Sequence, residues 1–92
     1  MPLLNETEIA EGLKGLSGWE QKGNEIVKAF KLKDFVEAVG FVTRVAILAE
    51  KADHHPDILI QYKNVTLTLS THSAGGLTEK DFGLAKEIDG LS

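Results

Sequence analysis

The three histidines of the chain all lie between residues 54 and 72. Pro56 follows His54 and His55 directly and disfavours helical geometry at His55, so this pair should lie where a helix gives way to a strand. His72 comes directly after a second predicted strand. In a hairpin the start of one strand lies beside the end of the other. We therefore expect the three imidazoles to converge at one edge of a sheet.

Imidazole gives and takes protons near neutral pH, so two such rings beside a substrate could divide the work of a general acid and a general base. Nearby carboxylates could fix a tautomer or stabilise an imidazolium: Glu50, Asp53, Asp57 and Asp81. No serine lies in a nucleophile-elbow sequence, and there is no cysteine. The Ser-Ala-Gly-Gly-Leu segment lacks the lysine of a phosphate-binding loop. The pattern favours acid–base chemistry.

Two other interpretations of the histidines remain open. A single histidine near a strand end is usually a partly exposed surface residue. Three histidines are also a familiar zinc ligand set. However, His54 and His55 are adjacent in an extended segment, so they should point to opposite sides, which disfavours a shared metal ion. We therefore predict no metal at this cluster.

The elements that must position these residues begin with a helix over residues 5–16, with Asn5 and Glu8 as a capping box. A hairpin of residues 19–21 and 25–32 should follow, although its second strand has apolar residues on both faces. A long helix over residues 34–52 comes next. Its predicted sheet-facing stripe consists of Phe35, Val39, Val42, Ala46 and Ala49. Further apolar residues on both flanks make the arc too wide for one sheet face, which favours an oligomer interface.

After the histidine pair, Ile58, Ile60 and Tyr62 predict a third strand, and a turn at residues 63–64 leads to a fourth. The fourth strand, residues 65–70, alternates strictly, so Val65, Leu67 and Leu69 should face the helices. Thr78 should cap a last helix. The predicted fold is α+β: a four-stranded antiparallel sheet with three helices packed on one face, in the order α-β-β-α-β-β-α.

The composition of the chain limits the classes of partner that it is expected to bind. The chain has 92 residues, a formal net charge of −4 and 26% charged residues, which fits one globular domain over residues 1–92. No basic patch is available to neutralise phosphates, so direct nucleic-acid binding is not expected. No apolar run approaches membrane-spanning length and the first residues do not form a signal pattern, so we expect a cytoplasmic protein without membrane contact.

The sequence also resembles a known family. Glu50-Lys-Ala-Asp-His-His-Pro56, then five residues, Tyr62, nine residues, His72, eight residues and Asp81 resemble the signature of the pterin-4a-carbinolamine dehydratases. The string LTLSTHSAGGLTEKD and the helical segment Phe41-Val-Thr-Arg-Val-Ala46 fit the same family. The resemblance extends over residues 19–89.

The resemblance implies loss of water from a 4a-hydroxytetrahydropterin to give the quinonoid dihydropterin, without metal or organic cofactor, in tetrahydrobiopterin recycling. It assigns His54 and His72 to acid–base catalysis and His55 mainly to substrate binding. Pro56, Thr71, His72 and Ser73 would line the pterin, with Glu50, Asp53 and Asp81 as supporting residues.

The resemblance further implies a homodimer through paired sheets or a homotetramer through the long helix. Many animal members carry an aromatic residue two positions after the His-His-Pro motif, where this chain has Ile58, so one wall of the pterin pocket should differ. The alternative function is a non-catalytic one, as a protein-binding dimerisation or assembly cofactor, because animal relatives act as dimerisation cofactors for a homeodomain transcription factor. A pure adaptor would not need the three histidines.

Overall fold

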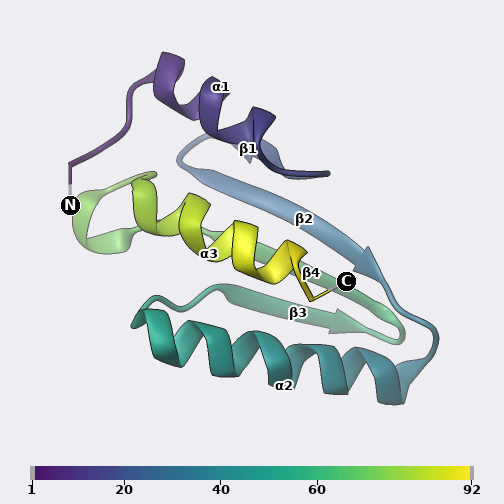
Figure 1. Ribbon diagram of the computed structural model, residues 1–92. Helices are drawn as coiled ribbons and strands as arrows, with labels where there is room; N and C mark the ends of the chain where they lie inside the picture. The colour runs from purple at the N-terminus through teal and green to yellow at the C-terminus, as the bar shows by residue number, and fades with distance from the viewer. Residues whose placement is uncertain (1, 92) are drawn as a thin grey trace.

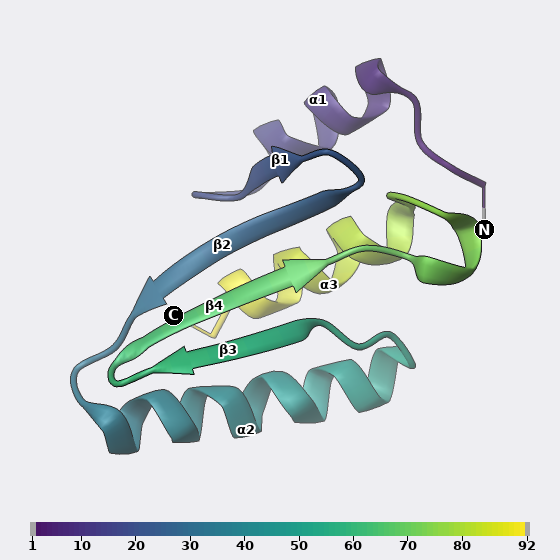
Figure 2. The same cartoon turned by 180° about the vertical axis from the view of Figure 1, so that it is seen from behind.

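Three α-helices and four strands follow one another in the predicted order. The computed structural model describes residues 2–91. Its elements are α1 (Glu6–Lys14), β1 (Glu20–Lys22), β2 (Glu25–Lys31), α2 (Phe35–Ala52), β3 (Asp57–Gln61), β4 (Asn64–Leu69), a short 3-10 helix (His72–Ala74) and α3 (Glu79–Asp89). Figure 1 shows the helices against the sheet, and Figure 2 shows the opposite side, with the strands in front. The predicted α+β fold class is confirmed.

The sheet has the strand order β1-β2-β4-β3, and every neighbouring pair is antiparallel. The two hairpins therefore lie side by side through β2 and β4, and β3 forms one edge. Side chains at alternate positions of β4 point to the helices, and Val65, Leu67 and Leu69 are fully buried. The predicted facing of β4 is confirmed.

Register resolves the facing of β2, which the sequence left ambiguous. Ile26 pairs with Leu69 and Phe30 pairs with Val65, so these β2 residues share the helix-covered face with the β4 core. Val27 and Ala29 consequently lie on the uncovered face.

Side chains cap the starts of the helices, and the predicted Asn5–Glu8 capping box is confirmed. The Asn5 side chain accepts a hydrogen bond from the Glu8 amide, and the Glu8 side chain accepts one from the Asn5 amide. Asp34 accepts from the Glu37 amide at the start of α2. Each cap satisfies amide groups that the first helical turn leaves without intrahelical partners.

The face that α2 turns to the sheet differs from the prediction, although Ala49 of the predicted stripe is buried. The buried residues of α2 are Ala38, Phe41, Val45 and Ala49. Phe35 and Val39, predicted to face the sheet, are 53% and 41% exposed. The apolar arc of α2 is wide enough to support either orientation, and packing against α3 and the sheet selects the side that carries Phe41.

A smaller correction concerns the turn between β3 and β4. It consists of Tyr62 and Lys63, because Gln61 and Asn64 already pair as strand residues. Tyr62 has a φ of 56°, in the left-handed region that non-glycine residues seldom adopt.

Asp89, at the end of α3, ties the first third of the chain to the last helix. Its carboxylate accepts hydrogen bonds from Trp19 Nε1 at 2.9 Å and Lys28 Nζ at 2.9 Å. It also accepts one from the Ser17 amide at 3.2 Å. Trp19, buried beside Phe30, thus has both its ring and its N–H satisfied.

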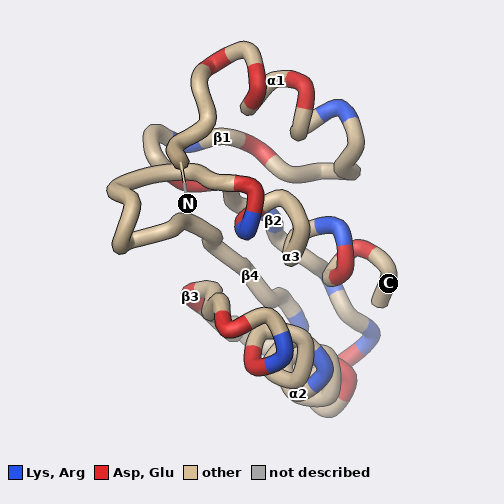
Figure 3. The backbone as a smooth tube through the Cα atoms, turned by 60° about the vertical axis from the view of Figure 1, so that its left-hand side comes forward, with Lys and Arg blue, Asp and Glu red and all other residues tan. Residues whose placement is uncertain are grey.

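Charges of both signs are interspersed over the surface, as Figure 3 shows along α2 and α3. Among residues 2–91, none of the helices is both long and apolar enough to cross a bilayer.

Two glycines allow the packing of α1 on α3 to be tested. A Cβ at Gly12 would lie 2.7 Å from Cδ1 of Phe82, whereas one at Gly83 meets nothing within 4 Å. We expect Gly12→Ala to lower the free energy of unfolding by about 1 kcal/mol, because overpacking outweighs the gain in helix propensity. Gly83→Ala should raise it by up to ~1 kcal/mol. Urea unfolding measures both, and a Gly12→Ala protein at least as stable as the wild type would contradict this packing.

Candidate functional site

The predicted convergence of the histidines is what the structure contains. His54, His55 and His72 line one hollow of about 470 Å³ between the end of α2 and the loop after β4. Its other lining residues are Asp53, Ser70, Thr71, Ser73 and Lys80. A larger hollow of about 540 Å³ lies between α1 and α3, but no histidine lines it. The chemistry of the side chains therefore makes the smaller hollow the candidate site.

The end of α2 positions the histidine pair. Asp53 ends the helix in the left-handed conformation, with a φ of 51°, which Asp tolerates better than most residues. The His54 amide then bonds back to the Ala49 carbonyl at 3.0 Å, the six-residue closure typical of a Schellman motif. This closure turns the chain sharply, so that His54 is buried while His55 is exposed.

A tight loop positions His72. The Thr71 amide donates to the Gly76 carbonyl at 2.8 Å, and the amides of Ala74 and Gly75 donate to the Thr71 carbonyl at 3.0 Å. Gly75 has a φ of 79°, where a side chain would be strained. The two glycines after the fourth strand therefore allow the loop to close with His72 exposed at its start.

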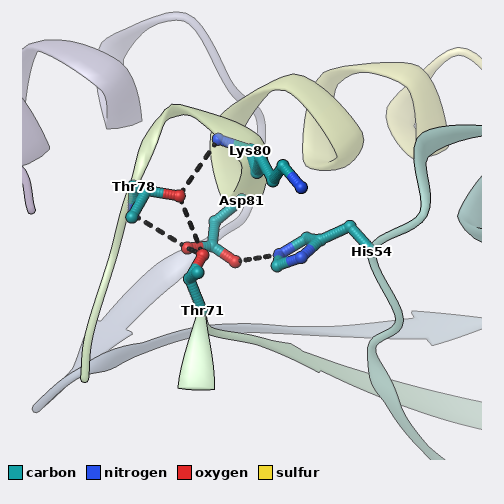
Figure 4. A network of polar contacts seen from close by, with 5 residues as sticks. All are labelled: His54, Thr71, Thr78, Lys80 and Asp81. Atoms are coloured by element: carbon teal, nitrogen blue, oxygen red, sulfur yellow. Dashed lines mark hydrogen bonds and ion pairs between the residues drawn. The ribbon is translucent and has the colours of Figure 1, made fainter. Parts of the chain in front are cut away.

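Asp81 is the buried partner of His54 in the network that Figure 4 draws. His54 Nε2 is 2.5 Å from Asp81 Oδ1, and both residues are buried. Asp81 Oδ2 accepts hydrogen bonds from Thr71 Oγ1 and from the Thr78 amide, each at 2.9 Å. Asp81 is thus at once the capping-box residue of α3 and the partner of a site histidine.

The other two histidines have different surroundings. His55 Nε2 lies 2.5 Å from Glu50 Oε2, and both side chains are largely exposed. The His72 ring makes no hydrogen bond or ion pair within residues 2–91. One hollow therefore holds a buried, anchored imidazole, an exposed paired one and an exposed unpaired one.

Most of the predicted site residues lie at this hollow, with three qualifications. Glu50 reaches it only through His55, and Asp81 only through His54. Pro56 is half-buried and does not line the hollow. Thr71 lines the hollow, but its hydroxyl donates to Asp81 and is not free for a ligand.

Sequence reasoning missed Ser70 and Lys80, both of which line the hollow. Ser70 directly follows β4, and the alternation of that strand places its side chain on the uncovered face of the sheet. This alternation could have pointed to Ser70. Lys80 lies in the first turn of α3, where a cation opposes the helix dipole. That local conflict is a signal that could have pointed to the residue.

Within residues 2–91, no group of three His, Cys, Asp or Glu side chains has the geometry to hold a metal ion. The nitrogens Nε2 of His54 and His55 approach different carboxylates.

Comparison with known proteins identifies the family. The model of the family described as pterin 4 alpha carbinolamine dehydratase matches residues 2–91. The chain belongs to the pterin-4a-carbinolamine dehydratase family. A relative from Roseiflexus castenholzii, provisionally named a pterin-4-alpha-carbinolamine dehydratase, is 60% identical over 95% of this chain and 94% of its own. A relative of the same name from Sulfolobus acidocaldarius is 49% identical over 94% of each chain.

Solved structures agree with this assignment. A Brucella melitensis protein described as a transcriptional coactivator/pterin dehydratase has a TM-score of 0.93 and 41% identity, covering 97% of each chain. A pterin dehydratase-like protein described as a RuBisCO assembly factor in the alpha-carboxysome has a TM-score of 0.69 at 24% identity, covering 84% of this chain and 92% of its own. The second likeness concerns the fold alone.

The free energy of unfolding should distinguish residues held by the Asp81 hydrogen bonds from His72, which lies outside them. Asp81→Ala would leave the Thr71 hydroxyl, the Thr78 amide and the His54 ring without their buried acceptor, so we expect a loss of about 3 kcal/mol in the free energy of unfolding. His72→Ala removes an exposed ring without a partner and should leave that free energy nearly unchanged. Urea unfolding of both variants checks this, and equal losses would contradict the network.

Proposed function

We propose that this member of the family is a dehydratase that removes water from 4a-hydroxytetrahydrobiopterin to give the quinonoid dihydropterin. The observation that carries the proposal is the convergence of three imidazoles in one hollow, where His54 and His55 contact different carboxylates and His72 contacts none. The hollow, of about 470 Å³, is in the size range of small-molecule sites.

The reaction needs two proton transfers. A base takes the proton from N5, and the electron pair of that N–H bond forms the N5=C4a double bond. The C4a–O bond breaks, and an acid protonates the departing hydroxyl so that it leaves as water. No electron is gained or lost, so residues that hold and move protons can carry the whole step, a contribution typically worth about 10²–10⁴-fold.

We assign this acid–base work to His54 and His72. His55 and Ser73 line the hollow and are assigned to pterin binding. Pro56 is assigned to it as the neighbour of His55, and Thr71 through its surface alone, because its hydroxyl is engaged by Asp81. Glu50, Asp53 and Asp81 are assigned to support. Asp81 and Glu50 can support the reaction only through the histidines that they contact. The proposed setting is a single cytoplasmic domain that serves tetrahydrobiopterin recycling.

The first test is a dehydration assay. The 4a-hydroxytetrahydropterin is generated in situ and its decay is followed by absorbance at sub-stoichiometric protein concentration. We expect turnover in the wild type, and a fall of at least about 10²-fold in kcat for His54→Ala and for His72→Ala, because each removes one proton-transfer group. Lys86→Ala, an exposed change on α3 outside the hollow, should keep the wild-type rate.

Three outcomes would contradict the proposal in different ways. No turnover by folded wild-type protein removes the activity itself. Wild-type rates in both histidine variants remove the acid–base assignment. Loss of activity on exhaustive chelation, with recovery on adding zinc, would show a metal-dependent reaction in place of histidine catalysis alone.

We further propose that the protein is a homodimer or homotetramer. The apolar residues that α2 and β3 leave exposed form a large set for a chain of this length. Those on α2 are Phe35, Val36, Val39 and Ile47, and those on β3 and its turn are Ile58, Leu59, Ile60 and Tyr62. The β3 strand is also an unpaired edge, which a second copy could extend.

A charge on α2 should break the helix-mediated interface. Ile47 is 57% exposed, so Ile47→Glu should leave the isolated fold intact while it disfavours burial against a second copy. We expect light scattering to give a smaller mass for this variant than for the wild type. Ala10→Glu on α1, an exposed position, adds the same single negative charge and is the matched control that should keep the wild-type mass. An unchanged mass for Ile47→Glu would remove α2 as an interface.

A protein-binding role is the second candidate. The Brucella melitensis structure at 41% identity is described as a transcriptional coactivator as well as a pterin dehydratase. The exposed apolar residues of α2 would be the surface for such a role in this chain. The two roles separate experimentally, because Ile47→Glu should impair partner binding while His72→Ala should not.

A further inference from the structure

Two buried threonines lie behind the site histidine and have no place in the acid–base assignment. Thr71 lies two residues after the end of β4 and is 5% exposed, and Thr78 caps α3 and is fully buried. Their hydroxyl oxygens are 2.8 Å apart. Figure 4 shows both threonines beside the Asp81 carboxylate, on the side away from His54.

Each threonine hydroxyl has a single proton, which fixes the direction of the hydrogen bonds that link the two threonines to Asp81. Thr71 Oγ1 donates to Asp81 Oδ2 at 2.9 Å. That bond uses the only proton of Thr71, so the proton between the two threonines must come from Thr78. Thr78 Oγ1 in turn accepts from the Lys80 amide at 3.3 Å. The donors therefore run in one direction, from the first turn of α3 to the Asp81 carboxylate.

This direction determines where the proton between Asp81 and His54 lies. Asp81 Oδ2 receives two donors, the Thr71 hydroxyl and the Thr78 amide. Oδ2 is the acceptor in both bonds, as the oxygens of an ionised carboxylate are. The short contact of 2.5 Å between Oδ1 and His54 Nε2 then places the proton on Nε2. His54 is held as the Nε2–H tautomer, or as the imidazolium when it is protonated.

The remaining nitrogen of His54 is available to a ligand. Nδ1 has no hydrogen-bond partner within residues 2–91, and no side-chain N or O atom of that range is both buried and unsatisfied. Nδ1 therefore reaches accessible space, and the hollow is the space that His54 lines. In the Nε2–H tautomer Nδ1 carries a lone pair and can accept a proton.

We propose that Thr71 and Thr78 are positioning residues that act through Asp81 to hold His54 in the Nε2–H tautomer, with Nδ1 as the nitrogen that takes the substrate proton. The catalytic use of Nδ1 rests on the proposed dehydratase function. The tautomer itself does not, because it follows from hydrogen-bond directions in the free protein.

The test measures the tautomer directly. Nitrogen NMR of protein labelled with ¹⁵N-histidine, at a pH where the ring is neutral, distinguishes a protonated from an unprotonated ring nitrogen. We expect the wild-type His54 to carry its proton on Nε2. In Thr71→Val, Asp81 loses a donor and Thr78 loses its acceptor, so the share of the Nδ1–H tautomer should rise severalfold. Thr71→Ser keeps the hydroxyl and should restore the wild-type spectrum.

Thr78→Val is the second variant, because Thr78 does not line the hollow and cannot act by touching substrate. It should change the tautomer in the same sense, and Thr78→Ser should restore it. The matched control is Thr66→Val on β4, a half-buried threonine that is absent from the network and should leave the His54 signals unchanged. Amide spectra of each variant report whether it is folded.

Kinetics separate positioning from direct binding. If Thr71 acts through His54, Thr71→Val should lower kcat roughly tenfold and leave KM within about twofold. At metal sites, residues that orient a histidine without touching the ligand contribute about 10- to 100-fold, and the lower end is expected here because Thr71 acts through Asp81. A rise in KM at unchanged kcat would instead make Thr71 a substrate contact. A wild-type His54 with its proton on Nδ1, or folded Thr71→Val and Thr78→Val proteins with unchanged His54 signals, would overturn the inference. An inactive wild type with the expected tautomer would contradict only the dehydratase function.

Discussion

The Asp81 carboxylate is the group on which both the fold near the site and the site itself depend. One oxygen receives the Thr78 amide and so helps to start α3, while the other holds the ring of His54 at the end of α2. A fully buried carboxylate is costly unless donors surround it, and here every donor comes from a segment that borders the hollow. Helix α3, the end of β4 and the end of α2 are thereby fixed to one another by a single group.

Away from the site, one copy of the chain does not bury all of its apolar surface. The core of a 92-residue chain is small, and the buried face of α2 uses only one side of its wide apolar arc. Val42 and Leu48 of α2 are half-buried against the core, whereas its other apolar side chains stay exposed, as does every residue of β3. The site lies at the other end of β3 from its turn, and the contacts that hold its histidines are made within one copy of the chain.

Features set by short-range rules were accessible from the sequence. The capping pairs Asn5–Glu8 and Thr78–Asp81 depend on three-residue spacing, and the alternation of β4 depends on strand geometry alone. Convergence of the histidines followed from hairpin connectivity, because adjacent strands leave few choices for where their ends meet. These rules gave the element order and the location of the candidate site.

Other features depended on tertiary packing and were not accessible. The sequence of α2 offers two plausible sheet-facing stripes, and only contact with α3 and the sheet selects the one with Phe41 and Val45. The inward direction of the Thr71 hydroxyl likewise requires the loop of residues 71–76 to close and bring Thr78 beside it. Lys80 was not predicted for the same reason. It lines the hollow only because the start of α3 lies beside the end of α2.

The differing surroundings of the three histidines bear on why the proposed reaction would need more than one of them. Removing a proton from N5 and donating one to the neighbouring hydroxyl requires two groups in opposite protonation states at the same moment. A ring that is held at Nε2 by a buried carboxylate can accept only at Nδ1, which suits a base of fixed orientation. His72 makes no such bond within residues 2–91, so its ring can turn and donate from either nitrogen. In the proposed mechanism, His54 is accordingly assigned the part of the base, and His72, as the imidazolium, the part of the acid.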